Sequence, residues 1–269
     1  MKNLKKYTHK PIIGPLIQKF IDFTVNREIK NVAHHFSTYL YPLLAESTEL
    51  SNESYKIRNN VYCDELNFLD TGHNGLEVDN FDEYSTHCLI QHIPTARFSG
   101  TVRVVRPEKN EHTIPLQEYC SDSISKDKIN PADFAPHEIC EISRLAVPSD
   151  FRKRKTDNFK GAATGVINQQ HYSEIELRCF PFIAVGLYLS AASIVIENEI
   201  KHTFVMMEPR LARSMSFIGI QFEQIGPAVN YHGKRAPYYI NPSLLMGNLT
   251  PGFQVMLKDI RKCLNHSSK

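Results

Sequence analysis

The longest apolar stretch of the chain, residues 180–196, limits the possible folds more than any other feature. Its 17 residues contain no charged side chain. A helix that is apolar on all sides must be covered by other parts of the protein, and a membrane-spanning helix needs about 20 apolar residues. Pro181, Gly186, Ser190 and Ser193 also interrupt the stretch. We therefore expect a core helix at 181–199 and no transmembrane segment.

The segments before this helix carry the pattern of strands. Residues 87–93 and 99–105 are predicted to form two strands of a hairpin, with Pro94 in the turn between them, and residues 138–147 alternate and predict a third strand. Periodicity predicts further helices at 15–39, 51–66 (capped by Ser51) and 209–218, and short strands at 41–45, 202–207, 221–225 and 237–240. This order predicts an α/β (α+β) fold with a mostly antiparallel sheet flanked by helices.

The length of 269 residues and the absence of a linker-like composition favour one main domain. We expect an N-terminal helical extension at 1–45 and the main domain at 46–269. The basic N-terminus is followed by an apolar segment too short for a signal peptide. The six widely spaced cysteines favour free thiols. A cytoplasmic protein is the expectation from these features.

The formal charge of +2 hides two clusters of opposite sign. Residues 59–96 contain seven acidic residues and no Lys or Arg, whereas residues 144–160 contain six basic residues against two acidic ones. The low total charge argues against a nucleic-acid partner. The scattered histidines do not match a zinc-ligand spacing, so no metal site is expected.

Charged residues recur in four short motifs between residues 58 and 144. They are R-x-x-V-Y at Arg58–Tyr62, E-x-D-x-x-D at Glu77, Asp79 and Asp82, G-x-x-R at Gly100–Arg103, and E-x-S-R at Glu141–Arg144. Strand alternation predicts that Glu141 and Ser143 share one face while Arg144 points to the other. A buried Glu141 needs a cationic partner, and Arg103 on the neighbouring strand is the candidate.

The three loop carboxylates have two interpretations. They could surround a cationic group of a substrate, or they could form structural salt bridges that hold a long loop on the sheet, with Arg58 as an anchor. The spacing alone leaves both interpretations open.

As an ordered set, these motifs resemble those of the acyl-homoserine-lactone (autoinducer) synthases and the long-chain N-acyl amino acid synthases. Together with the length and the N-terminal extension, they resemble most the acyltransferases associated with PEP-CTERM/exosortase systems. The resemblance covers about residues 55–240 and implies a GNAT-type acyl-CoA N-acyltransferase fold. One departure is Phe68, which stands where the autoinducer synthases usually carry Trp; the chain has no Trp.

The resemblance implies an acyltransferase that transfers groups other than amino-acyl groups. Glu141 matches the position proposed as general base, acting through water, with Arg103 and Arg144 as further catalytic positions. The implied substrate-binding residues are Arg58, Glu77, Asp79 and Asp82. Acyl transfer to an amine needs a proton acceptor and an oxyanion donor, for which we expect a backbone N–H at residues 145–147. No covalent intermediate is required, and Cys140 is interpreted as a small buried residue.

The acyl donor is expected to be a thioester of acyl carrier protein or coenzyme A, with no tightly bound cofactor. In place of a glycine-rich phosphate loop, the segment after the third strand carries Arg152, Lys153, Arg154 and Lys155. This basic cluster suits docking of an acidic acyl carrier protein; the alternatives are a solvated basic loop and binding of the coenzyme A phosphate or anionic lipid. Candidates for an acyl tunnel are Phe182, Leu187, Met206, Met207, Met215 and Phe217.

The predicted function is therefore transfer of a fatty acyl group from a carrier-protein or coenzyme A thioester to the amine of an amino acid or similar small acceptor. Two alternatives remain: an acyl-homoserine-lactone synthase that uses S-adenosylmethionine, and a non-catalytic binding protein of the same fold.

Overall fold

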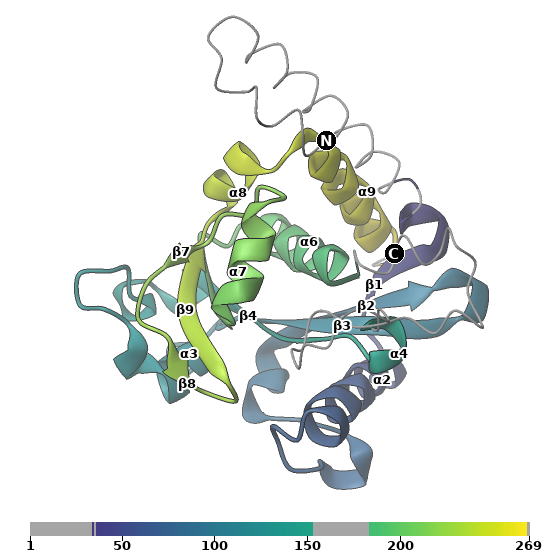
Figure 1. The fold of residues 1–269 in the computed structure, drawn as a ribbon, viewed down its shortest axis with the longest axis horizontal. Coiled ribbons are helices and arrows are strands. Elements are labelled where there is room, and N and C mark those ends of the chain that lie inside the picture. The colour runs from purple at the N-terminus through teal and green to yellow at the C-terminus, as the bar shows by residue number, and fades with distance from the viewer. Residues whose placement is uncertain (1–33, 35, 153–182, 268–269) are drawn as a thin grey trace, which may run out of the picture.

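The computed structural model describes residues 34, 36–152 and 183–267. These residues form a mixed α/β structure around one large sheet (Figure 1). The strands are β1 (Leu40–Leu44), β2 (Ser85–His92), β3 (Arg97–Val105), β4 (Ile139–Ala146), β6 (His202–Met207), β7 (Glu223–Gln224), β8 (Val229–Asn230) and β9 (Lys234–Ile240). The α-helices are α2 (Thr48–Arg58), α3 (Pro115–Tyr119), α4 (Ser149–Arg152), α6 (Ile183–Glu197), α7 (Pro209–Ser216), α8 (Pro242–Asn248) and α9 (Pro251–Ser267).

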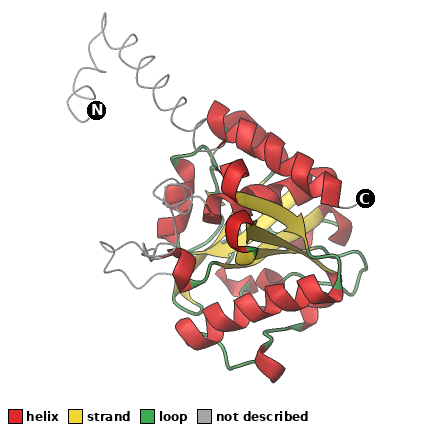
Figure 2. Cartoon of the chain, turned by 90° about the vertical axis from the view of Figure 1, so that its right-hand side faces the viewer, coloured by secondary structure: helices red, strands yellow, loops and turns green. Residues whose placement is uncertain are grey.

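The main path of the sheet runs β1-β2-β3-β4-β6-β9-β7, and β8 pairs with β9. Every pairing is antiparallel except that of β4 with β6. Helices cover both faces of the sheet (Figure 2), with α6 and α9 on one face and α2 on the other (Figure 1). The predicted architecture, a mostly antiparallel sheet flanked by helices, is confirmed.

Helix α6 fills the centre of the larger core, as the apolar stretch predicts. Every residue from Ile183 to Val195 is buried. The helix packs so closely on its neighbours that a Cβ at Gly186 would lie 2.5 Å from the ring of Phe36. This contact explains why a glycine is needed inside the helix despite its cost to helix stability. No helix among the described residues is long and apolar enough to span a membrane.

The predicted hairpin and third strand match β2, β3 and β4 within two residues at each end. Helix α2 begins earlier than predicted, because Ser47, and not Ser51, caps it: the Ser47 hydroxyl accepts the N–H of Leu50 at 3.3 Å. The helix then continues as a π-helical segment, Asn59–Glu65.

Part of the predicted N-terminal extension lies outside the described residues. Its last residues form β1, which pairs with β2 at the edge of the sheet. Helices α8 and α9 were not predicted.

Two irregularities in β4 shape the middle of the sheet. Opposite β3, the pairing moves from Arg103–Ser143 to Thr101–Ala146, so β4 carries one extra residue in a bulge. Arg144, inside this bulge, has a positive φ of 51°. On its other side, β4 pairs with β6 only from Ile139–His202 to Glu141–Phe204. Beyond Glu141 no pairing joins the two strands.

Candidate active site

The loop that carries Glu77, Asp79 and Asp82 is held in place by hydrogen bonds within its own turn. Asp79 caps the short 3-10 helix Asn80–Tyr84, and Asp82 accepts the N–H of Asp79 at 2.8 Å in return, which completes a capping box. Phe81, within this turn, is buried in a cluster on the α2 side of the sheet. The turn therefore presents the carboxylates of Asp79 and Asp82 to the sheet at fixed positions.

Arg58 at the end of α2 anchors this loop. Its guanidinium is fully buried, donates to both oxygens of Asp82 at 2.7 and 3.0 Å, and donates through Nε to Glu77. Burial alone raises the pKa of Asp82, but the hydrogen bonds and charges of Arg58 and the charge of Arg103 outweigh it and hold that pKa below its ordinary value. Arg144 and Arg58 likewise outweigh burial at Glu77 and lower its pKa, so Asp82 and Glu77 are both carboxylates at neutral pH.

Arg103 and Arg144 complete the network from the sheet. Arg103, fully buried on β3, donates to Asp79 at 2.5 Å and to Asp82 at 2.8 Å, and its Nε donates to the Ser143 hydroxyl at 3.1 Å. Arg144 donates to Glu77 and to Asp79, in both cases at 3.0 Å through Nη2. Three arginines and three carboxylates therefore neutralise one another.

These contacts favour the structural interpretation of the loop acids. Each of the three carboxylates already accepts from two arginines. Removing one partner from such a buried network leaves an uncompensated buried charge, which lowers the folding stability by about 3–5 kcal/mol. A role of Glu77, Asp79, Asp82 and Arg58 in binding the acceptor stays a prediction.

The orientation of Arg144 differs from the prediction. Strand alternation places its side chain opposite that of Glu141, but the bulge and the positive φ turn it onto the same face. There it lies over the ring of Tyr62, with 5.8 Å from the guanidinium carbon to the ring centroid. The predicted pair of Arg103 with Glu141 is wrong as well: Glu141 stands opposite Val105, and Arg103 stands opposite Ser143.

Glu141 is a carboxyl group of the site that does not pair with any of these three arginines. It is 2% exposed, and its Oε2 accepts the N–H of Leu116, at the start of α3, at 2.6 Å. Burial raises the pKa of Glu141 to about 7, while the Leu116 N–H and the charges of Arg103 and Arg144 act in the opposite direction. A carboxyl group with this pKa can take up and release a proton at neutral pH.

Glu141 lines a small cavity of about 40 Å³. Tyr62, Phe68, Leu116, Ser143, Arg144, Met206, Tyr231, His232 and Arg235 are among its other lining residues. A second cavity of about 80 Å³ lies along the stretch where β4 and β6 no longer pair. Apolar residues line much of it, and the charged residues Arg144, Glu208 and Arg235 also line it. The two cavities share part of their walls.

Tyr62, in the π-helical segment after α2, reaches the stretch where β4 and β6 separate. Its hydroxyl donates to the carbonyl of Leu145 at 2.7 Å, beyond the last β4–β6 pair. The bond fixes the strand edge where the oxyanion-binding N–H was predicted, at residues 145–147. That role also stays a prediction.

Cys140 and the residues predicted for an acyl tunnel lie partly in the core, partly at the second cavity and partly on the surface. Cys140 is fully buried in the core on the α6 side, and burial raises its thiol pKa to about 12. Met206 and Met207 line the second cavity, Leu187 and Met215 are core residues, and Phe217 is 81% exposed. Phe182 lies outside the described residues.

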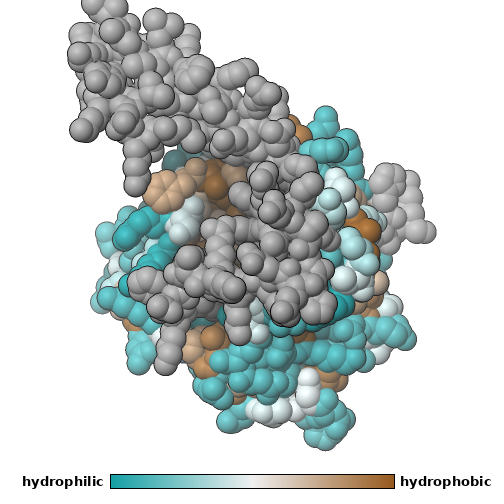
Figure 3. Space-filling model, turned by 45° about the vertical axis from the view of Figure 1, so that its right-hand side comes forward, coloured by the Kyte–Doolittle hydropathy of each residue, from teal (hydrophilic) through white to brown (hydrophobic). Residues whose placement is uncertain are grey.

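The predicted docking cluster is described only at Arg152, whose guanidinium pairs with Glu65. Lys153, Arg154 and Lys155 lie outside the described residues. On the face seen in Figure 3, the described surface is mostly hydrophilic, with small hydrophobic patches between.

Three residues in or beside the charged network and the Glu141 cavity were not predicted from the sequence. The N–H of Leu116 is a backbone group in a short helix, so no residue type marks it. His87 is buried near Asp82, with 3.4 Å between Nε2 and Oδ1, and burial lowers its pKa to about 4. Arg235 follows Lys234 at the start of β9. Two adjacent basic residues outside any motif give no indication in the sequence of a functional role.

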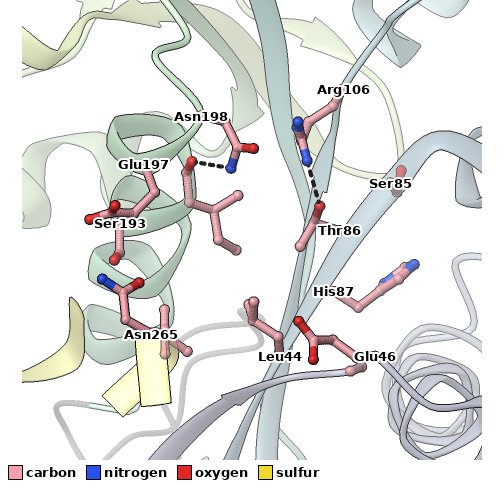
Figure 4. A pocket seen from close by; sticks show the side chains of 13 residues that line it. Leu44, Glu46, Ser85, Thr86, His87, Arg106, Ser193, Glu197, Asn198 and Asn265 are labelled. Atoms are coloured by element: carbon pink, nitrogen blue, oxygen red, sulfur yellow. Dashed lines mark hydrogen bonds between the residues drawn. The ribbon is translucent and has the colours of Figure 1, made fainter. Parts of the chain in front are cut away.

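A larger cavity of about 470 Å³ lies at a different end of the sheet, between β1, β2 and the C-terminal ends of α6 and α9 (Figure 4). Thr86, Arg106 and Glu46 face Ser193 and Asn265 across it, whereas the ring of His87 points away (Figure 4). The cavity contains neither Glu141 nor the three paired arginines. Among the described residues, no group of His, Cys, Asp and Glu could hold a metal ion.

Comparisons with known proteins bear on the fold. Residues 57–160 match the acetyltransferase (GNAT) domain family. No curated protein matches the sequence.

Among solved structures, the AHL synthase LasI is similar with a TM-score of 0.54 and 16% identity, over 78% of this chain and 96% of LasI. FeeM, an N-acyl amino acid synthase from uncultured soil microbes, has a TM-score of 0.52 and 13% identity, over 80% and 96% of the two chains. BjaI, a CoA-dependent acyl-homoserine lactone synthase solved with SAM and isopentyl-CoA, has a TM-score of 0.52 and 14% identity, over 82% and 89%. These likenesses confirm the predicted GNAT-type fold.

Proposed function

We propose that this protein is an N-acyltransferase that moves a fatty acyl group from a thioester to the amine of an amino acid or a similar small acceptor. The observation that carries the proposal is Glu141: a buried carboxyl group, outside the neutral arginine–carboxylate network, that lines a cavity at the point where β4 and β6 separate. The resemblance of the charged motifs and the GNAT-type fold support the same reaction class.

The reaction needs one proton acceptor at the amine. An acceptor ammonium first loses a proton to solvent, and its neutral nitrogen then attacks the thioester carbonyl. As the C–N bond forms and the C–S bond breaks, Glu141 takes the second proton from nitrogen and passes it to the leaving thiolate. The products are an amide and a free thiol, and Glu141 returns to its ionised form.

The separated strands suit the donor side of this reaction. Strand β4 has no β6 partner beyond Glu141, and the cavity there is lined by Leu145, Val205 and Met207. Apolar walls of this kind fit an acyl chain. We assign the oxyanion-binding N–H to residues 145–147, where the Tyr62 hydroxyl holds the strand through the Leu145 carbonyl.

The donor we favour is an acyl carrier protein thioester in the cytoplasm. The basic run at residues 152–155 attracts an acidic carrier through charge complementarity. Because Arg152 pairs with Glu65, the docking proposal rests on Lys153, Arg154 and Lys155. Acyl-coenzyme A is the alternative donor, and the name of the structural neighbour BjaI records a CoA-dependent enzyme.

The acceptor is tested by expressing the protein and analysing lipid extracts by mass spectrometry. We expect N-acyl amino acids, and their loss in Glu141→Gln with the circular dichroism spectrum unchanged. Removal of a general base lowers the rate by about 10²–10⁴-fold. Acyl-homoserine lactones in the extract would instead identify an autoinducer synthase, and no acylated product would favour the non-catalytic alternative.

The donor is tested with charge reversal at Lys153, Arg154 and Lys155. We expect a higher KM for acyl carrier protein thioesters and an unchanged KM for a short acyl-thioester mimic. Equal effects on both donors would contradict carrier docking at this segment.

A further inference from the structure

Arg235 is a fourth arginine at the site, and it differs from the other three in its contacts. Arg58, Arg103 and Arg144 are each paired with two carboxylates. Among the described residues, no ion pair joins the guanidinium of Arg235 to a carboxylate; the guanidinium lies over the ring of Phe68, with 5.9 Å from its central carbon to the ring centroid. Within the described part of the chain, the site therefore holds one positive charge without a carboxylate partner.

The position of Arg235 connects it to both cavities. It is half-buried near the start of β9 and lines the Glu141 cavity and the cavity between β4 and β6. Along β9 it shares a face with Tyr239, which belongs to the core cluster on the Glu141 side of the sheet. Its guanidinium thus stands where the proposed acceptor and the proposed thioester meet.

The other described titratable groups that line the two cavities do not form an ion pair with Arg235. Glu208 lines the cavity between β4 and β6, and Glu141 lines the smaller cavity of about 40 Å³. Burial and the positive charges of Arg235 and Arg144 lower the pKa of His232, so the imidazole beside Arg235 is neutral at pH 7. An anion that enters the Glu141 cavity therefore meets, among the residues that the structure describes, a guanidinium with no carboxylate partner.

We propose that Arg235 binds the carboxylate of an amino acid acceptor and so selects amino acids over amines without a carboxylate. This inference rests on the proposed function. An amino acid carries its amine and its carboxylate on one carbon atom, so a group that reads the carboxylate must line the same cavity as the base. Glu141 and Arg235 meet this requirement, and the planar guanidinium can donate two parallel hydrogen bonds to a carboxylate.

The test compares each acceptor with its own uncharged analogue. Initial rates are measured with one acyl thioester and the pairs glycine and glycinamide, leucine and leucinamide, and phenylalanine and phenylalaninamide. For the wild type we expect a higher kcat/KM with the acid than with the amide. In Arg235→Gln we expect the KM for the acid to rise by about tenfold to hundredfold, because a hydrogen bond to a charged group is lost, while kcat and the KM for the amide change little.

Two variants complete the experiment. Arg235→Lys keeps the charge but not the planar fork, so it should restore part of the preference for the acid. Lys234→Gln removes the neighbouring exposed cation, which lines neither cavity, and should leave all constants unchanged. Retained turnover of the amides shows that Arg235→Gln is folded.

The outcomes separate the two proposals. Wild-type transfer with equal losses for acid and amide in Arg235→Gln would overturn the role of Arg235 and leave the proposed function standing. A rise in the KM for the thioester alone would also overturn it, because the guanidinium would then bind the donor. If the wild type acylates no amine, the proposed function fails and the inference fails with it.

Discussion

The replacement Glu141→Gln tests the central physical claim through stability as well as activity. Burial raises the pKa of Glu141 from an ordinary value of 4.5 to about 7 in the folded protein. Between these two pH values the folded state binds more protons than the unfolded state. Folding stability therefore falls as pH rises through this window. The direction is opposite to that of a salt-bridged carboxylate.

The size of the effect follows from the two pKa values. Each unit of pKa difference corresponds to about 1.4 kcal/mol, so the contribution lost between pH 5 and pH 8 is about 2–3 kcal/mol. Glutamine has the same shape as glutamic acid, and its side-chain oxygen can still accept the N–H of Leu116. It carries no charge, so the variant should lack this pH-dependent loss.

The assay is urea unfolding of the wild type and Glu141→Gln at pH 5 and pH 8. The variant should gain about 2–3 kcal/mol relative to the wild type between the two pH values, provided that unfolding is two-state. Glu138→Gln is the control, because Glu138 lies nearby but pairs with Lys201 on the surface, and its pKa is lowered. Parallel stability profiles for wild type and Glu141→Gln would refute the claim that burial raises the Glu141 pKa.

Three further variants test the surroundings of Glu141. Asp82→Asn should lower the free energy of unfolding by about 3–5 kcal/mol, because Arg58 and Arg103 lose a shared charge; a loss below about 1 kcal/mol in urea would contradict a tightly coupled network. Tyr62→Phe removes the bond to the Leu145 carbonyl and should cost about 1 kcal/mol in thermal unfolding; an unchanged melting temperature would argue against it. Cys140→Ala should keep full acyl-transfer activity, because the thiol stays protonated with a pKa of about 12; loss of turnover in a folded variant would revive a covalent mechanism.

The strands around the site could be predicted because short runs rich in apolar residues are separated by turn residues such as Pro94, although most residues of β2 and β3 are buried on both faces. The strands β2, β3 and β4 follow from this pattern. Helix α9 was missed, although its buried residues Phe253, Met256 and Ile260 recur at helical spacing. The cap of α2 was misplaced because Ser47 and Ser51 are both good capping residues, and tertiary context decides between them.

The candidate site was predicted in its residue types more than in its contacts. The charged motifs identify Arg58, Arg103, Arg144 and Glu141, but the pattern alone gives the wrong partner for Arg103. The bulge in β4 depends on pairing with β3, so no local rule reveals which face Arg144 occupies. Arg235 comes from the far end of the chain and reaches the site only because β9 pairs with β6.

The bulge at Arg144 also sets how this chain tolerates changes in length. Deleting Leu145 would shift the frame of β4 and return Arg144 to the apolar face under α6. One deletion would then bury an unpaired guanidinium and leave Glu77 and Asp79 each without one of its partners. The exposed turn Ile93–Thr95, between β2 and β3, carries no such coupling. Natural or designed insertions and deletions should therefore accumulate at that turn and be excluded from the middle of β4.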